Sequence, residues 1–201
     1  MQGYKYPAGE KPTSLALVAL GSNLPAGGLM PAAAVSRAMD LLEDRTRTAL
    51  RRSRLWRTPA FPPGAGPPFV NAAAALDWGG AAEDLLAILH GIEAAFGRQR
   101  SLRWEARIMD LDLLALGDKV LPDRVEFERW SGLSGDAAAA MTPDRLILPH
   151  PRLAERAFVL APLADVAPDW RHPVTGDSVS AILAALPASA LEGVEPLDPA
   201  G

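Results

Sequence analysis

Residues 108–115 read Ile-Met-Asp-Leu-Asp-Leu-Leu-Ala, directly after the arginine-rich segment Arg-Gln-Arg-Ser-Leu-Arg-Trp-Glu-Ala-Arg at 98–107. The run 108–115 is almost wholly apolar and contains no Gly or Pro, which predicts a strand. Because side chains alternate along a strand, Asp110 and Asp112 are expected to project from one face. The apolar residues between them would then face a core.

Two carboxylates on one strand face lie roughly 7 Å apart at ~3.3 Å per residue, and they repel each other unless a cation lies between them. A pair of Mg²⁺ ions would remove that repulsion. The neighbouring arginines are suited to binding phosphate through two parallel hydrogen bonds. The segment therefore suggests a polyphosphate site with bound metal. From residue types alone, the alternative is that Arg and Asp pair on a solvated surface.

Five further motifs accompany the arginine–aspartate segment in a fixed order. They are Ala19-Leu20-Gly21-Ser22-Asn23, Arg57-Thr58-Pro59, Phe69-Val70-Asn71-Ala72-Ala73, Leu148-Pro149-His150-Pro151-Arg152 and Arg156-Ala157-Phe158-Val159-Leu160-Ala161-Pro162-Leu163. Each motif is weak alone. Together, over about residues 15–186, they resemble the 6-hydroxymethyl-7,8-dihydropterin pyrophosphokinases of folate synthesis.

The resemblance implies transfer of pyrophosphate from ATP to the hydroxymethyl group of 6-hydroxymethyl-7,8-dihydropterin, which releases AMP. It implies two Mg²⁺ ions, with Asp110 and Asp112 as their ligands. It assigns catalysis to Arg103, Arg107, Asp110 and Asp112, and ATP binding to Arg98, Arg100, Trp104, His150 and Arg156. It assigns pterin binding to Thr58, Phe69, Asn71 and Phe158.

The chemistry of the pterin agrees with that last set. An Asn side chain has one donor group and one acceptor, so Asn71 can match the amide-like edge of the ring. Phe69 lies two residues away on the same strand face and can stack on the ring, with Phe158 on the other side. The alternatives are a core position for each Phe and a structural role for Asn71.

Other residues support weaker interpretations. The segment 103–107 is expected to close over ATP as a lid, but Glu105-Ala106 replaces the Gly-Pro of many relatives. His150 has a structural alternative to nucleotide contact. His90 and Arg145 are further nucleotide candidates, and Glu93 either faces the nucleotide or lies on a solvated helix surface.

Hydrophobic periodicity predicts an α+β fold with a ferredoxin-like βαββαβ core, a largely antiparallel sheet and both helices of that core on one face. The family resemblance implies further helices on the other face, so helices are expected on both. The expected elements are strands at 14–20, 48–58, 69–76 and from 108, and helices from Pro31, at 81–96, at 156–164 and up to Leu186. A flexible tail is expected at 1–13, one pyrophosphokinase domain at 14–190 and a second tail at 191–201. Within the domain, 117–145 is interpreted as an insertion with a short helix at 136–141.

The whole chain sets limits on its class. It has 201 residues, a net charge of −4 and no cysteine, which argues against a nucleic-acid partner and against disulfides or thiolate metal sites. No secretory signal and no run of 18 apolar residues is found, so we expect a cytoplasmic protein that does not bind membranes. A monomer is expected as well. The rival classes are a non-catalytic nucleotide or nucleic-acid binding module and a divalent-metal hydrolase.

Overall fold

Strand β1 (Ser14–Ser22) lies inside an open antiparallel sheet, between β4 (Phe69–Trp78) and β5 (Asp110–Leu116). The computed structural model describes residues 12–60, 66–97, 108–133 and 141–197. Strand order is β5-β1-β4-β3-β6, and β2 also pairs with β4. The remaining strands are β2 (Arg51–Arg52), β3 (Trp56–Thr58) and β6 (Glu195–Pro196).

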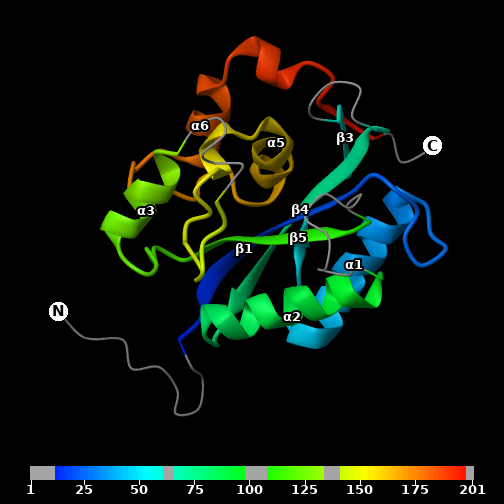
Figure 1. Ribbon diagram of the computed structural model, residues 1–201, viewed down its shortest axis with the longest axis horizontal. Coiled ribbons are helices and arrows are strands. Elements are labelled where there is room, and N and C mark those ends of the chain that lie inside the picture. The colour runs from blue at the N-terminus through cyan, green and yellow to red at the C-terminus, as the bar shows by residue number, and fades with distance from the viewer. Residues whose placement is uncertain (1–11, 61–65, 98–107, 134–140, 198–201) are drawn as a thin grey trace.

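Helices cover both faces of this sheet (Figure 1). The helices α1 (Pro31–Thr46) and α2 (Ala82–Ala95) pack on one face, and α5 (Ala157–Val166) with α6 (Val179–Ala185) on the other. The α+β class and the ferredoxin-like core are confirmed, because the order of β1, α1, β2 with β3, β4, α2 and β5 is the expected βαββαβ. In the described ranges, no helix has the length and apolarity to cross a bilayer.

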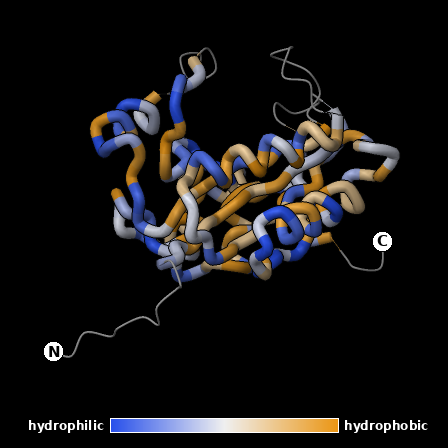
Figure 2. Tube along the Cα trace, turned by 90° about the horizontal axis from the view of Figure 1, so that it is seen from below, coloured by the Kyte–Doolittle hydropathy of each residue, from blue (hydrophilic) through white to orange (hydrophobic). Residues whose placement is uncertain are grey.

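Alternation along the strands divides the core into two layers. Val18 and Leu20 of β1 pack against α1 and α2, whereas Leu17 of β1 and Ala73 of β4 pack against α5. Figure 2 shows the hydrophobic strands running between more hydrophilic outer segments. A bulge in β5 lies between the partners of Leu17 and Val18, and it adds one residue to β5.

The two helices beneath the sheet begin and end as expected. Pro31 occupies the first turn of α1, where its missing N–H has no helical partner to lose. Gly97 follows α2 with φ of +88°, a left-handed conformation that favours glycine at a helix end. The apolar face of α2 includes the fully buried Leu85, Leu89 and Ile92.

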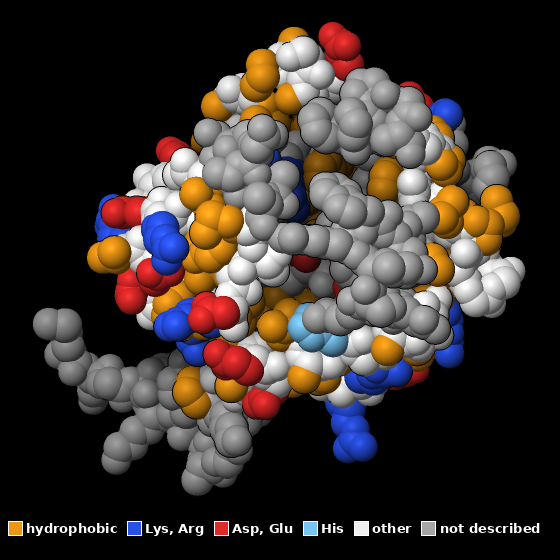
Figure 3. Space-filling view, viewed as in Figure 1, with side chains coloured by type: hydrophobic (Ala, Val, Ile, Leu, Met, Phe, Trp, Pro, Cys, Tyr) orange, Lys and Arg blue, Asp and Glu red, His pale blue; other side chains and the backbone are white. Residues whose placement is uncertain are grey.

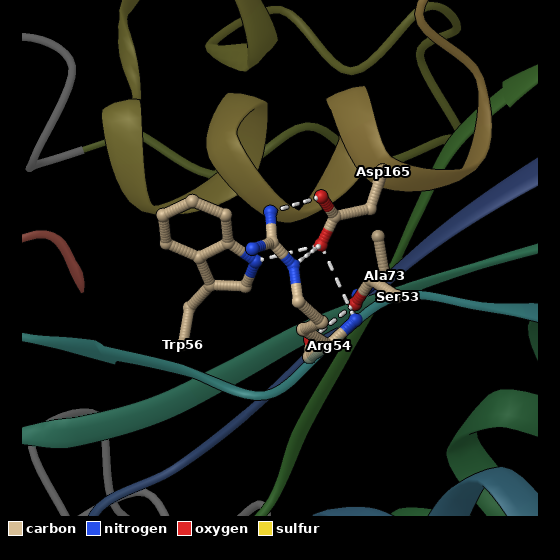
Figure 4. A network of polar contacts seen from close by, with 5 residues as sticks. All are labelled: Ser53, Arg54, Trp56, Ala73 and Asp165. Carbon is tan, nitrogen blue, oxygen red and sulfur yellow. Dashed lines mark hydrogen bonds and ion pairs between the residues drawn. The ribbon is translucent and has the colours of Figure 1, made fainter. Parts of the chain in front are cut away.

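The single strand expected at 48–58 is instead two short strands, β2 and β3. The break is at Ser53, whose Oγ accepts a hydrogen bond from the Ala73 N–H and donates to the Arg54 carbonyl oxygen (Figure 4). A side chain thus replaces a main-chain acceptor in the ladder. Arg54 and Trp56, beyond the break, then reach Asp165 on α5.

Two further segments differ from expectation. Residues 191–197, expected in a tail, contain β6, which pairs with β3 and covers its free edge. The region 117–145 contains α3 (Arg124–Ser131), which was not predicted. The side chain of Asp123 accepts a hydrogen bond from the Glu126 N–H at its start, so the pair Asp-x-x-Glu was a usable signal. The helix expected at 136–141 lies mostly outside the described residues.

Candidate active site

Three residues stand in one row across the sheet, each on a different strand. Gly21 of β1 is paired with Asn71 of β4 on one side and with Asp110 of β5 on the other. Paired residues of neighbouring strands point to the same face, so Asn71 and Asp110 flank a position without a side chain. Two strand spacings put them roughly 10 Å apart. The row lies on the α5 face, beyond the larger side chains that fill the core there.

The two aspartates of β5 project from the sheet as the alternation predicts. Met109 and Leu111 are buried, whereas Asp110 and Asp112 are half-buried. Asp112 is also part of an ion pair, because its Oδ2 lies 3.8 Å from Nη1 of Arg156. That contact joins β5 to the start of α5 inside the site.

The side chains proposed for the pterin edge are held in place by each other. Asn71 is 6% exposed and donates from Nδ2 to Oγ1 of Thr58, which is 3% exposed, at 2.8 Å. Thr58 is paired in turn with Phe69, which is half-buried. The bond fixes the orientation of the amide and directs its oxygen, Oδ1, toward Gly21.

The first turn of α5 presents two candidate residues. Arg156 is the N-cap of the helix, and its guanidinium carbon lies 5.7 Å from the centre of the Phe158 ring. Phe158 is 38% exposed, although most of the helix is apolar and faces the core. An exposed aromatic ring beside a cation suits contact with a planar ligand. The core alternative for Phe158 is therefore wrong.

His150 lies beside β5, where its backbone N–H donates to the carbonyl oxygen of Leu114. Its ring nitrogen Nδ1 accepts a hydrogen bond from the Arg152 N–H. Burial, and next the charge of Arg156, lower the pKa of His150 from 6.5 to about 3, against the opposing effect of Asp110. The imidazole is therefore neutral at pH 7, with its proton on Nε2.

Several expected site residues lie outside the described residues: Arg98, Arg100, Arg103, Trp104 and Arg107. Figure 3 shows acidic atoms and a histidine side chain near the centre of the face seen in Figure 1. Within the described part of the chain, no group of three or more His, Cys, Asp or Glu side chains is arranged to hold a metal. Asp110 and Asp112 nevertheless offer oxygen donors from one face, which suits Mg²⁺ that takes its other ligands from phosphate and water.

Two buried polar residues make contacts in or just before β5 that the sequence did not indicate. Ser22 is fully buried and donates from Oγ to the carbonyl oxygen of Ile108 at 2.6 Å. Glu93 is 2% exposed, and its Oε1 accepts from the Leu111 N–H at 2.9 Å. The solvated-surface interpretation of Glu93 is wrong. Its spacing from Leu85 and Leu89 on the apolar face of α2 was a signal of burial.

Comparisons with known proteins bear on this site. Residues 17–168 match the family model of 7,8-dihydro-6-hydroxymethylpterin-pyrophosphokinase (HPPK). The chain is 39% identical over 181 residues to a Pseudomonas aeruginosa protein named 2-amino-4-hydroxy-6-hydroxymethyldihydropteridine pyrophosphokinase, covering 90% of this chain and 94% of that one. A Methylorubrum extorquens protein of the same name is 36% identical over 180 residues, covering 90% and 98%.

Solved structures agree on the fold. A crystal structure of wild-type Plasmodium falciparum HPPK-DHPS matches with a TM-score of 0.57 at 14% identity, over 88% of this chain. An HPPK-DHPS structure in complex with substrates matches with a TM-score of 0.60 at 12% identity, over 87% of this chain. The chain spans about 45% of each of those longer polypeptides.

Proposed function

Because the chain belongs to the 7,8-dihydro-6-hydroxymethylpterin-pyrophosphokinase family, we propose that it transfers pyrophosphate from ATP to 6-hydroxymethyl-7,8-dihydropterin in folate biosynthesis. The products are AMP and the pterin diphosphate. The hydroxyl oxygen of the substrate attacks the β-phosphorus of ATP, the bond from that phosphorus to the α-phosphate oxygen breaks, and the hydroxyl proton is lost. Catalysis of this kind depends mainly on position and on charge neutralisation.

The observation that best supports the proposal is the row formed by Asn71, Gly21 and Asp110. A side chain suited to reading an amide-like ring edge and a carboxylate suited to metal–phosphate binding lie on the same face. The bare backbone of Gly21 separates them. A flat ring lying over Gly21 with its edge on Asn71 directs its substituent toward β5, where the phosphates would lie.

Asp110 and Asp112 bind Mg²⁺ in this proposal, and their exposure on one face of β5 supports it. The ions, when bound, neutralise the polyphosphate and lower the pKa of the attacking hydroxyl. The ion pair of Asp112 with Arg156 keeps a cation beside the carboxylates. Arg156 can exchange that partner for a phosphate oxygen when ATP binds.

His150 contributes a neutral donor for ATP. Its Nδ1 is engaged by the Arg152 N–H, so its Nε2–H is the group available to a nucleotide oxygen. The low pKa keeps this role unchanged across physiological pH. The remaining ATP contacts, Arg98, Arg100 and Trp104, follow from the family resemblance.

Thr58, Phe69, Asn71 and Phe158 bind the pterin. The buried hydrogen bond from Asn71 to Thr58 supports an amide held ready before substrate arrives. Phe69 shares the face of Asn71, and Phe158 is exposed on the first turn of α5, so each offers an aromatic surface to one side of the ring.

Arg103 and Arg107 neutralise the transferring phosphates from a segment that closes over ATP and excludes water. This assignment rests on the motif Arg-Trp-x-x-Arg. Arg103→Ala or Arg107→Ala is expected to slow turnover far more than it weakens pterin binding. Equal losses in both quantities would contradict a catalytic lid.

The test is an incubation with ATP, Mg²⁺ and 6-hydroxymethyl-7,8-dihydropterin, followed by separation of the nucleotides. AMP is the expected product. Formation of ADP would indicate an ordinary kinase, and release of phosphate without the pterin would indicate a hydrolase. ATP that stays unchanged would indicate a binding module without catalytic activity. Asp110→Asn and Asp112→Asn should abolish AMP formation. Thermal stability should be equal or slightly raised in Asp110→Asn, because one of two neighbouring like charges is removed, whereas Asp112→Asn also loses the ion pair with Arg156. Near-normal turnover of either variant at saturating Mg²⁺ would refute the metal assignment.

We also propose a monomeric, cytoplasmic enzyme. Candidate residues for both substrates lie on this one chain, and the absence of cysteine suits a reducing compartment. Light scattering at assay concentration tests the monomer, and fractionation of the native cell tests the compartment.

A further inference from the structure

Glu93 is a buried carboxylate that neither substrate needs in the proposed reaction. It lies on α2, beneath the sheet, and is 2% exposed. Burying an ionised side chain is unfavourable unless strong hydrogen bonds compensate. One of its partners is the Leu111 N–H, at 2.9 Å from Oε1. Leu111 lies between the two aspartates, so this bond acts on the backbone that joins them.

The position of β5 explains why that N–H requires a partner. The strand is at the end of the sheet order, with β1 on one side. The outward N–H groups of an edge strand have no neighbouring strand to provide a carbonyl acceptor. Because Leu111 is buried, its N–H needs an acceptor from within the protein. Glu93 supplies the acceptor at this point.

A second buried polar group fixes the start of the same segment. Ser22 is fully buried and donates to the carbonyl oxygen of Ile108 at 2.6 Å. Ser22 directly follows Gly21, the partner of Asp110 across the sheet. Two buried side chains, from β1 and α2, therefore bind the backbone just before and between the aspartates.

We propose that Glu93 is a positioning residue for the metal site, which acts by fixing the peptide between Asp110 and Asp112 through the Leu111 N–H. This inference rests on the proposed function, because it takes the two aspartates as the Mg²⁺ ligands. Groups that orient metal ligands commonly change metal affinity by 10- to 100-fold when removed.

Two variants of similar size separate hydrogen bonding from charge. Glu93→Gln keeps an oxygen acceptor without the charge, and Glu93→Met removes both. We expect Glu93→Met to raise the Mg²⁺ concentration for half-maximal AMP formation about tenfold, with turnover largely restored at saturating Mg²⁺. Glu93→Gln should stay within about twofold of wild type. Leu85→Ala, on the same buried helix face, is the control for lost stability and should leave the Mg²⁺ requirement unchanged.

Hydrogen exchange of the Leu111 amide, followed by NMR without substrates, gives a readout independent of turnover. Exchange should be slow in wild type and Glu93→Gln, and at least about tenfold faster in Glu93→Met, because only that variant lacks the acceptor. Equal Mg²⁺ requirements in Gln and Met variants, or an unchanged Leu111 amide in both, would overturn the inference. If Glu93→Met does not fold, a Mg²⁺ requirement raised tenfold in Glu93→Gln overturns it.

The proposed function can fail separately from this inference. A wild-type protein that forms no AMP contradicts the proposed function. In that case the anchoring bond is still supported if the Leu111 amide exchanges slowly in the wild-type protein and faster in Glu93→Met.

Discussion

Asn71 leaves no room for a side chain on Gly21. A Cβ at position 21 would lie 2.6 Å from Oδ1 of Asn71, closer than real Cβ atoms approach an oxygen. The amide cannot move aside without loss, because its Nδ2 donates to Thr58 and the side chain is buried. Gly21 is thus required by a close approach, and it determines where the amide oxygen points.

Gly21→Ala is expected to impair recognition of the pterin while ATP binding is retained. The new methyl group displaces the Asn71 amide and breaks its bond to Thr58, at a cost of about 1 kcal/mol or more. We expect the KM for the pterin to rise about tenfold or more, with a smaller change in the KM for ATP.

Gly91→Ala is the matched control for this substitution. Its Cβ would meet only the Nη1 end of the exposed Arg45 side chain, at 2.8 Å, which can move. Alanine in a helix is favoured over glycine by about 1 kcal/mol, so stability should be unchanged or raised. Equal increases in pterin KM for both variants would contradict the role of Gly21.

Thr58→Val tests whether the amide of Asn71 is held ready for its substrate. Valine keeps the shape of threonine but leaves Nδ2 of Asn71 without its acceptor, so the amide can rotate. Steady-state kinetics should show a pterin KM raised about tenfold in Thr58→Val, and largely restored in Thr58→Ser, which retains the hydroxyl. A Thr58→Ser enzyme as impaired as Thr58→Val would indicate that packing, not the hydroxyl, matters there.

The sequence could predict what depends on local periodicity. Alternation at 108–115 was sufficient to put Asp110 and Asp112 on one face and Met109 in the core. It could not predict that the Oγ of Ser53 would take the place of a main-chain acceptor, because that bond depends on Ala73, twenty residues away.

The same limit applies to the interior polar contacts of the site. The bond from Leu111 to Glu93 joins a strand to a helix 18 residues earlier, and Ser22 reaches Ile108 across 86 residues. In each bond, the two partners are distant in the sequence and meet only in the folded chain. The row of Asn71, Gly21 and Asp110 likewise depends on strand register, which no single segment encodes.

Asp165 connects α5 to the strand that carries Thr58, and its loss should destabilise the protein. It accepts hydrogen bonds from Nε and Nη2 of Arg54 and from Nε1 of Trp56 (Figure 4). Burial alone would raise the pKa of Asp165, but the bonds from Arg54 and Trp56 lower it below 3.8. Asp165→Ala removes the shared acceptor and leaves the exposed Arg54 guanidinium to water. Urea titration should show a loss of about 1 kcal/mol, mainly from the hydrogen bonds that are removed.

Asp40→Ala provides the comparison for Asp165. Asp40 pairs with Arg52, and its side chain is 48% exposed, against 17% for Asp165. Exposed ion pairs contribute less than about 1 kcal/mol, so this variant should lose less stability. If both variants lose the same amount, the network around Asp165 contributes no more than a surface ion pair.

His150 should make the metal-free protein sensitive to acid. Its pKa is about 3 in the folded chain, against 6.5 when exposed, so between these values the unfolded state binds the extra proton. The free energy of unfolding is therefore not reduced by His150 above pH 6.5, and it falls as the pH decreases from 6.5 toward 3. At pH 4 the loss from this residue reaches about 3 kcal/mol. His172, whose pKa is also lowered by burial, adds a smaller effect of the same sign.

His150→Asn removes the titration and retains an acceptor for the Arg152 N–H. Urea unfolding from pH 7 to pH 4, with EDTA present, should show a shallower loss of stability for this variant than for wild type. His172→Asn should retain most of the wild-type slope, because His150 still titrates in it. Parallel pH profiles for wild type and His150→Asn would mean that the imidazole is protonated as easily in the fold as in water.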